Sequence, residues 1–140
     1  MLVPHLDPKT ERIAQLPLFA TCSLRELGRI ATVGTELDLA ARREIPSRRA
    51  PRCELIVLLE GSVELVECGR VVSWLDAGGV VGPLTPQVPP AAVMRVGTSG
   101  ASVLAFASSE VASLTHDIPT FAARLAAAPR FEVSTRLDNC

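Results

Sequence analysis

The chain has 140 residues, of which 48% are hydrophobic and 21% are charged, with a formal net charge of −1. These values predict one domain, spanning residues 1–140, with enough apolar material for a substantial core. A charge so close to zero excludes strong long-range attraction to nucleic acid or anionic membranes, and no apolar run reaches the roughly 18 residues that span a bilayer.

The first residues, MLVPHLDPKTE, lack the basic and apolar regions of a secretory signal peptide. We therefore expect a cytoplasmic location, where cysteines are kept as thiols. The chain has four of them: Cys22, Cys53, Cys68 and Cys140. None of their spacings is the CxxC of a zinc site, so we expect no bound metal.

Two N-terminal helices are predicted within residues 11–33. The segment ERIAQL suits a short helix that Pro17 stops. The second helix begins after Ser23, which can form a capping box with Glu26. Gly34 follows this helix in the position of a C-cap glycine.

Short β-like segments separated by turn residues fill residues 35–107. The predicted strands are 35–40, 43–46, 53–59, 62–68, 70–75, 79–82, 91–97 and 102–107. Many short strands without intervening helical periods predict a β-sandwich or a β-barrel.

The segment CELIVLLEGSVELVEC is predicted to be a hairpin with a two-residue turn at Glu60-Gly61. In this register four apolar side chains share one face: Ile56, Leu58, Val63 and Leu65. Cys53 then lies opposite Cys68 at a spacing that a disulfide could bridge, so an oxidised form is an alternative to two thiols.

Two C-terminal helices are predicted within residues 109–127. Ser109 can cap the first of them, and Pro119 falls in the first turn of the second. The tail spans residues 128–140, and its segment FEVSTRLDNC is expected to be short and frayed. The segment FAARLAAA has an alanine-rich face, so a structural barrel that oligomerises through this helix is one alternative function.

Three segments together resemble cyclic nucleotide-binding domains, over roughly residues 12–127. They are LPLFATCSLRELGRIA, IVLLEGSVELVECGRVVSWLDAGGVVG and VLAFASSEVASLTHDIPTFAARL. The resemblance implies a mainly β fold with flanking helices, built as a double-stranded β-helix (jelly-roll) barrel. It also implies a regulatory role of the CRP-like kind, in which ligand binding moves the helices that flank the barrel.

In that family a phosphate cassette reads approximately Gly-Glu, then leucines, then Pro-Arg-Ala-Ala. Its backbone N–H groups and its arginine hold the cyclic phosphate, while the glutamate accepts a hydrogen bond from the ribose. The corresponding residues here are Gly82, Pro83, Leu84, Pro90, Ala91 and Ala92. Pro83 and Pro90 thus replace the two polar partners and offer neither a side-chain hydrogen bond nor a backbone N–H. We therefore expect a degenerate ligand site without a cyclic nucleotide or other cofactor.

Arg95 is a possible substitute for the missing cation. Its odd offset from Pro90 places it on the opposite face of a strand, which favours a solvated arginine. A cAMP or cGMP sensor that uses backbone donors near Gly82 and a non-standard arginine stays open as an alternative. The family also has glycines ahead of the hairpin, and Ala41 and Arg49 occupy those places here.

Enzyme chemistry has little support in the sequence. A metal-dependent barrel enzyme needs histidines on its strands, whereas His5 precedes the first helix and His116 ends a later one. The chain has no GxGxxG or GK[S/T] motif for binding phosphates. The hairpin glutamates, Glu60, Glu64 and Glu67, suit a solvated face better than a catalytic pair.

Five arginines form a local basic cluster: Arg42, Arg43, Arg48, Arg49 and Arg52. This cluster lacks aromatic residues for stacking on nucleic-acid bases, and about thirteen residues follow the last helix, too few for a helix-turn-helix. We expect a non-enzymatic regulatory or interaction module that binds an unknown protein partner or itself, with no DNA or membrane partner.

Overall fold

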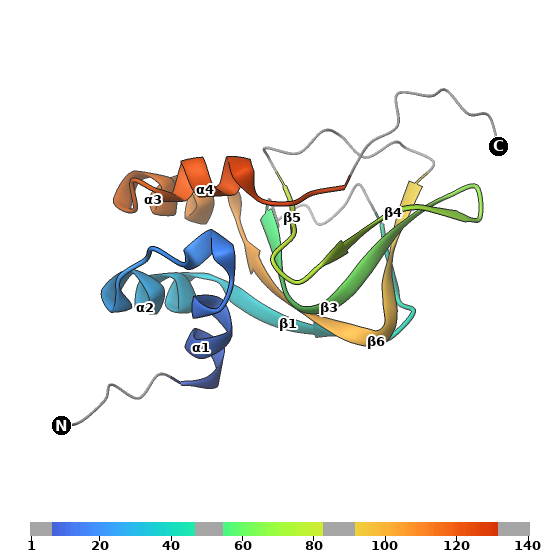
Figure 1. Ribbon diagram of the computed structural model, residues 1–140, viewed down its shortest axis with the longest axis horizontal. Helices are drawn as coiled ribbons and strands as arrows, with labels where there is room; N and C mark the ends of the chain where they lie inside the picture. The colour runs from blue at the N-terminus through green and yellow to red at the C-terminus, as the bar shows by residue number, and fades with distance from the viewer. Residues whose placement is uncertain (1–6, 47–54, 83–91, 132–140) are drawn as a thin grey trace.

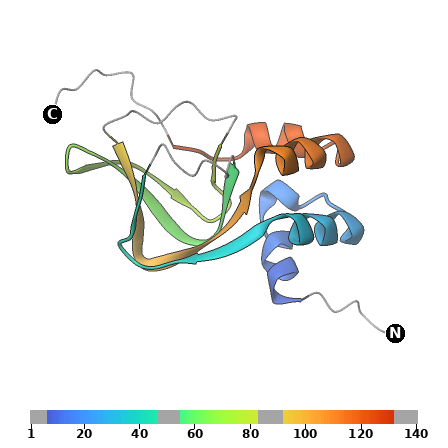
Figure 2. The ribbon, with the colours of Figure 1, turned by 180° about the vertical axis from the view of Figure 1, so that it is seen from behind.

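The computed structural model describes residues 7–46, 55–82 and 92–131. Helices gather at one end of the molecule, and the strands form a barrel at the other (Figure 1). From behind, β1 (Thr35–Leu39) continues from the end of a helix into the barrel wall (Figure 2). None of the described helices has the length and apolarity that crossing a bilayer requires.

The N-terminal helical region consists of α1 (Pro8–Ala14), the 3₁₀ helix η1 (Pro17–Phe19) and α2 (Leu24–Val33). The carboxylate of Asp7 accepts a hydrogen bond from the Thr10 N–H at 2.8 Å, which starts α1 three residues earlier than predicted. The predicted capping box of α2 is confirmed.

Gly34 ends α2 as predicted, but it does so without the left-handed conformation typical of a C-cap glycine. Its φ and ψ of −75° and 146° are extended. A Cβ atom there would lie 2.8 Å from the side chain of Leu104 and 2.9 Å from that of Phe106. Close packing of the helix end against the sheet therefore requires the glycine.

The described residues form one sheet with β1 and five further strands. These are β2 (Glu44–Pro46), β3 (Leu55–Glu67), β4 (Arg70–Asp76), β5 (Val80–Val81) and β6 (Ala92–Phe106). The predicted segments 53–59 and 62–68 correspond to the single strand β3, and 91–97 and 102–107 correspond to β6. Both long strands bend, so each contributes to two halves of the sheet.

One half of the sheet contains β1, the second part of β6, the first part of β3, and β5. The other half contains β2, the first part of β6, the second part of β3, and β4. Strands that bend from one sheet into another are a recognised way to build the corners of a β-sandwich or barrel. The expected mainly β barrel with flanking helices is confirmed.

The predicted turn at Glu60-Gly61 is wrong, because β3 continues through it. The hairpin turn lies at Cys68-Gly69, where Glu67 pairs with Arg70. Gly61 does have the predicted positive φ, 84°, but it lies where the register between β3 and β6 shifts. A Cβ atom there would lie 2.2 Å from the carbonyl oxygen of Gly100, so the glycine permits two bent strands to approach.

Two hydrophobic clusters lie on opposite sides of the sheet. The first joins the helices to the outer face of one sheet half and contains Phe19, Ile30, Leu104 and Phe121. The second fills the barrel interior. Alternate residues of β3 serve the two clusters, as expected for a strand buried on both faces.

The C-terminal helices are α3 (Ser108–Asp117) and α4 (Phe121–Ala127). The predicted cap at Ser109 is wrong by two residues. Ala107 is the N-cap, and its N–H donates to the Glu110 carboxylate at 2.7 Å. The prediction that Pro119 falls in the first turn of the second helix is wrong, because α4 begins at Phe121 with Thr120 as its N-cap and Pro119 precedes both.

Candidate functional site

The two ends of the predicted phosphate cassette lie on different parts of the barrel. Gly82 directly follows β5, and Ala92 begins β6, where it pairs with Glu67 of β3. The remaining cassette positions lie outside the described residues: Pro83, Leu84, Pro90 and Ala91. The structure therefore gives the positions where this segment leaves the barrel wall and rejoins it.

Among the described residues, the barrel interior beside these ends is apolar and closely packed. A cavity of about 20 Å³ remains there, lined by Gly79 and apolar residues of four strands, including Leu58, Val63, Leu75 and Met94. A single water molecule needs about 10–15 Å³, whereas ligand pockets commonly measure about 300–1,000 Å³. The described lining of this cavity carries no charge and leaves space for about one water molecule.

Arg95 lies in an ion pair instead of on a freely solvated face. It alternates along β6 with Met94 and Val96, whose side chains belong to the interior cluster. Its Nε and Nη2 atoms donate to one carboxylate oxygen of Glu64, at 3.2 and 2.9 Å. In the sheet register Glu44 of β2 stands on its other side. This arginine is thus already paired with the carboxylate of Glu64.

The segment after α4 packs onto the barrel, so the expectation of a frayed tail from residue 131 is wrong for Phe131, which is the one residue of that tail that the structure describes. Phe131 is 5% exposed and belongs to the interior cluster. The Val80 N–H donates to the Pro129 carbonyl at 2.8 Å, which fixes the segment beside β5. Arg130 donates to two carbonyls at the end of α4, at 2.6 and 2.8 Å.

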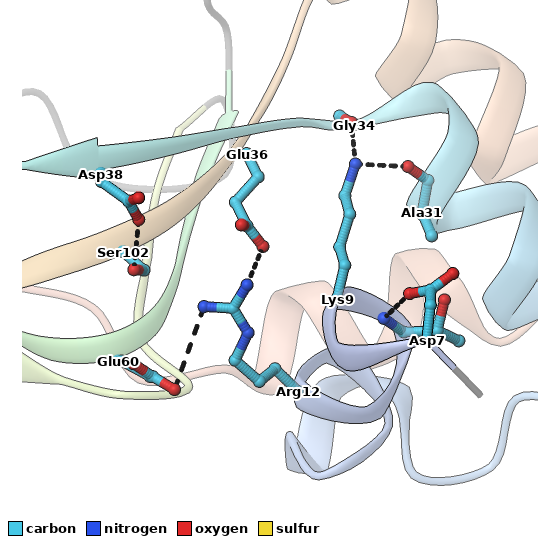
Figure 3. Close-up of polar contacts among 10 residues, drawn as sticks. Asp7, Lys9, Arg12, Ala31, Gly34, Glu36, Asp38, Glu60 and Ser102 are labelled. Carbon is cyan, nitrogen blue, oxygen red and sulfur yellow. Dashed lines mark hydrogen bonds and ion pairs between the residues drawn. The ribbon is translucent and has the colours of Figure 1, made fainter. Parts of the chain in front are cut away.

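Polar contacts also join the N-terminal helices to the barrel wall (Figure 3). Lys9 of α1 donates to two carbonyls at the end of α2, at 2.6 and 3.0 Å. Arg12 reaches from α1 to Glu36 of β1, with Glu60 of β3 at 3.9 Å. The hydrogen bond to Glu36 raises the pKa of the Arg12 guanidinium. A shift of α1 would therefore disturb both the end of α2 and the barrel.

The described part of the basic cluster lies in the turn between β1 and β2, where Arg42 and Arg43 are exposed. The other members lie outside the described residues: Arg48, Arg49 and Arg52. Arg42 has a φ of 68°, which is the conformation that glycine adopts most easily.

The cysteines differ from the expectation of four thiols. Cys22 is free, and its burial raises the pKa of the thiol. Cys68 is disulfide-bonded. The predicted opposition of Cys68 and Cys53 depended on the turn at Glu60-Gly61, which does not exist, so this pairing argument fails. Cys53 itself lies outside the described residues.

Solved structures share this arrangement of barrel and helices. The Thermus thermophilus catabolite activator protein aligns with a TM-score of 0.62 and 20% identity, over 79% of this chain and 55% of its own. A cyclic nucleotide-binding-like protein from Brucella abortus aligns with a TM-score of 0.52 and 16% identity, over 79% and 99%. The chain has the cyclic nucleotide-binding fold.

A third likeness, to a CooA variant from Carboxydothermus hydrogenoformans, has a TM-score of 0.63 and 10% identity, over 89% of this chain and 80% of that one. No protein-family model and no curated protein matches the chain. The cyclic nucleotide-binding fold thus rests on shape, and the chain spans little more than half of the Thermus protein.

The sequence did not predict the roles of two residues that shape the candidate site, Glu64 and Phe131. Glu64 was assigned only to a solvated face, although it neutralises Arg95. Phe131 was placed in a frayed tail, although it fills the barrel interior. One signal was available for the second residue, because phenylalanine is among the residue types most often fully buried.

Proposed function

We propose that this chain is a non-enzymatic regulatory or interaction module that has the cyclic nucleotide-binding fold but does not bind cyclic nucleotides. One observation carries the proposal. The interior cavity beside the cassette ends measures about 20 Å³ and has an uncharged lining among the described residues. A cyclic nucleotide would have to displace packed apolar side chains to enter it.

The charge of a cyclic phosphate adds to this steric cost. Pro83 and Pro90 occupy the positions of the family's glutamate and arginine, and Arg95 is held by Glu64. Loss of a charged partner for a desolvated anion costs about 4 kcal/mol, which is roughly a thousandfold in affinity. A micromolar site would become millimolar.

Among the described residues, no group of three or more His, Cys, Asp and Glu side chains is placed to hold a metal ion. His116 is exposed in the last turn of α3, at the helical end of the molecule. A regulatory output would pass through the helices, which Lys9 and Arg12 join to the barrel, to a protein partner or a second copy of the chain.

Calorimetric titration with cAMP and cGMP tests the proposal. We expect no saturable heat up to about 1 mM of either nucleotide. The matched variant carries Pro83→Glu and Pro90→Arg, which restore the two polar cassette side chains. Binding gained by this variant would assign the loss to those two positions, whereas no gain would assign it to the filled interior. Micromolar binding by the unchanged chain would overturn the proposal and favour the sensor alternative.

The oligomerising barrel is a second candidate, favoured by the exposed alanines Ala123, Ala126 and Ala127 on α4. Small side chains permit helices to approach closely. Size-exclusion chromatography with light scattering would show a stable dimer that Ala126→Glu converts to a monomer. A monomer at all concentrations would eliminate this candidate.

A further inference from the structure

A groove lies at the helical end of the molecule, where α2 passes beside the C-terminal end of α3 (Figure 1). Its volume is about 760 Å³, and pockets that hold small ligands commonly measure about 300–1,000 Å³. Its lining includes Ser23 and much of α2 on one side and Asp117 and Ile118 on the other. The described residues therefore form a ligand-sized space outside the closely packed barrel.

The apolar part of this lining belongs to the core of the helical end. Val33 packs against the first hydrophobic cluster, and Ile118 is a member of it. Gly28 adds bare helix backbone to the same lining. The apolar body of a ligand therefore has a fixed surface against which to pack.

Gly28 weakens α2 without a packing reason inside the described chain. Glycine is the weakest helix former after proline, and Gly28 is the fifth of the ten residues of α2. A Cβ atom at this position would have nothing within 4 Å. Gly34 is the contrast, because a Cβ atom there would lie 2.8 Å from Leu104. The missing side chain at Gly28 therefore serves to keep the groove open.

Two arginines flank Gly28 on the same face of α2. Arg25 and Arg29 are four residues apart, a spacing at which like charges on a helix repel each other. Arg29 is compensated, because its Nη2 atom donates to Ser113 Oγ at 2.7 Å and forms an ion pair with Asp117. Arg25 is exposed and forms no ion pair with another described residue.

Glu26, which also lines the groove, does not compensate Arg25. Its carboxylate accepts a hydrogen bond from the Ser23 N–H at 2.8 Å as part of the capping box. Adjacent residues of a helix do not face each other, so Glu26 points away from Arg25. An anion bound beside Arg25 would relieve the repulsion between the two arginines.

Helix α2 thus departs from local helix preferences twice, at the glycine and at the arginine pair, and both departures line one groove. Proteins typically tolerate such departures at functional sites. We propose that this groove binds a ligand with a carboxylate and an apolar body. Arg25 holds the carboxylate, and the body lies over Gly28 against Val33 and Ile118. The site goes beyond the proposed function and does not depend on it.

An ¹⁵N–¹H NMR titration of the full chain with octanoate tests this inference, with 1-octanol as the neutral control of equal chain length. Octanoate is expected to cause saturable shifts at the amides of Arg25, Gly28 and Asp117, with a midpoint below about 1 mM. 1-Octanol should bind about tenfold more weakly, because it cannot form a charge-assisted hydrogen bond with Arg25.

Two variants separate the contribution of charge from that of space. Arg25→Gln should weaken octanoate binding about tenfold, whereas Arg43→Gln, at an exposed arginine between β1 and β2, should leave it unchanged. Gly28→Leu fills the groove and should abolish the octanoate shifts. Leucine is a stronger helix former than glycine, so the urea midpoint of this variant should not fall, which separates loss of binding from loss of folding.

The absence of saturable octanoate shifts up to about 1 mM would overturn the inference. Equal binding of 1-octanol, or undiminished binding by Arg25→Gln, would show that the arginine does not hold the carboxylate. Undiminished binding by Gly28→Leu, or shifts confined to interior amides such as that of Met94, would place octanoate outside this groove. The probe is not a cyclic nucleotide, so failure here is distinguishable from failure of the proposed function.

Discussion

Arg95 and Glu64 stand directly opposite each other on β6 and β3, and both Arg95 donors meet one carboxylate oxygen, at 2.9 and 3.2 Å. About a quarter of each side chain is exposed. Glu64 already partly neutralises the charge of this arginine, so the arginine would attract an incoming phosphate less strongly than a free guanidinium would. The pair therefore argues against Arg95 as a replacement for the cassette arginine.

The Arg95–Glu64 pair is expected to contribute modestly to stability. A double-mutant cycle with Arg95→Gln and Glu64→Gln should give a coupling energy of about 0.5 kcal/mol, typical of a partly exposed cross-strand pair. Urea unfolding at low salt measures it, and about 1 M NaCl should reduce it through screening. A coupling energy of zero at low salt would show that the two side chains do not interact in solution.

Gly61→Ala is expected to destabilise the barrel strongly. The residue combines a φ of 84° with a Cβ position 2.2 Å from the Gly100 carbonyl oxygen. Gly69 is the matched control, because its φ is 76° but nothing lies within 4 Å of its Cβ position. Urea unfolding should show a loss of about 1 kcal/mol for Gly69→Ala and more than 3 kcal/mol for Gly61→Ala. Equal losses would mean that conformational strain alone decides the effect.

Phe131→Ala is expected to cost about 3 kcal/mol of stability, because it removes a 5% exposed ring from the interior cluster. Leu24→Ala is the control, since Leu24 is 52% exposed and should cost less than about 0.5 kcal/mol. Thermal or urea unfolding of both variants makes the comparison. A loss at Phe131 as small as that at Leu24 would place the ring outside the core.

Cys22 is expected to react slowly with iodoacetamide in the folded chain. Burial, followed by the negative charge of Glu26, raises the pKa of its thiol above the ordinary value of 9.0, so less thiolate is present at a given pH. The raised pKa also means that folding favours the protonated thiol. The preference of the folded state for the protonated thiol adds to the free energy of unfolding in full below pH 9. This addition is lost as the pH rises through the pKa that the thiol has in the folded state.

Mass spectrometry after timed labelling at pH 8.5 measures the rate at Cys22. We expect labelling several-fold slower in the folded chain than in urea. The variant Cys22→Ala should lose the stability decline above pH 9 that the thiol causes. Equal labelling rates in the two states would contradict the burial of this thiol.

The fold could largely be predicted from sequence because its signals are local. The capping box at Ser23 and the alternation of the strands specify elements directly. The hairpin was mispredicted at Gly61, since a positive-φ glycine suits a bulge as well as a turn. The prediction that Leu58 and Val63 share a face is nevertheless correct. The irregular register between them moves the following side chains of β3 to the opposite face, which is the same outcome that the predicted turn would have given.

The candidate site was less predictable because it depends on contacts distant in sequence. Phe131 reaches the barrel interior from beyond α4, and Arg12 meets Glu36 across the helix–barrel boundary. Sequence periodicity reports which face of an element is buried but not which partner covers it. The cassette prolines carried the prediction of a degenerate site, and Pro83 and Pro90 lie outside the described residues, so that prediction stands as a proposal.

The central claim is that the barrel interior does not accept a cyclic nucleotide. A ¹⁵N–¹H NMR titration of the full chain with cAMP tests it most directly, with AMP as the matched control. The account predicts that up to about 1 mM cAMP causes no larger shifts than AMP at the amides of Met94, Val96 and Val103. Saturable shifts of these interior residues with a micromolar midpoint would contradict it.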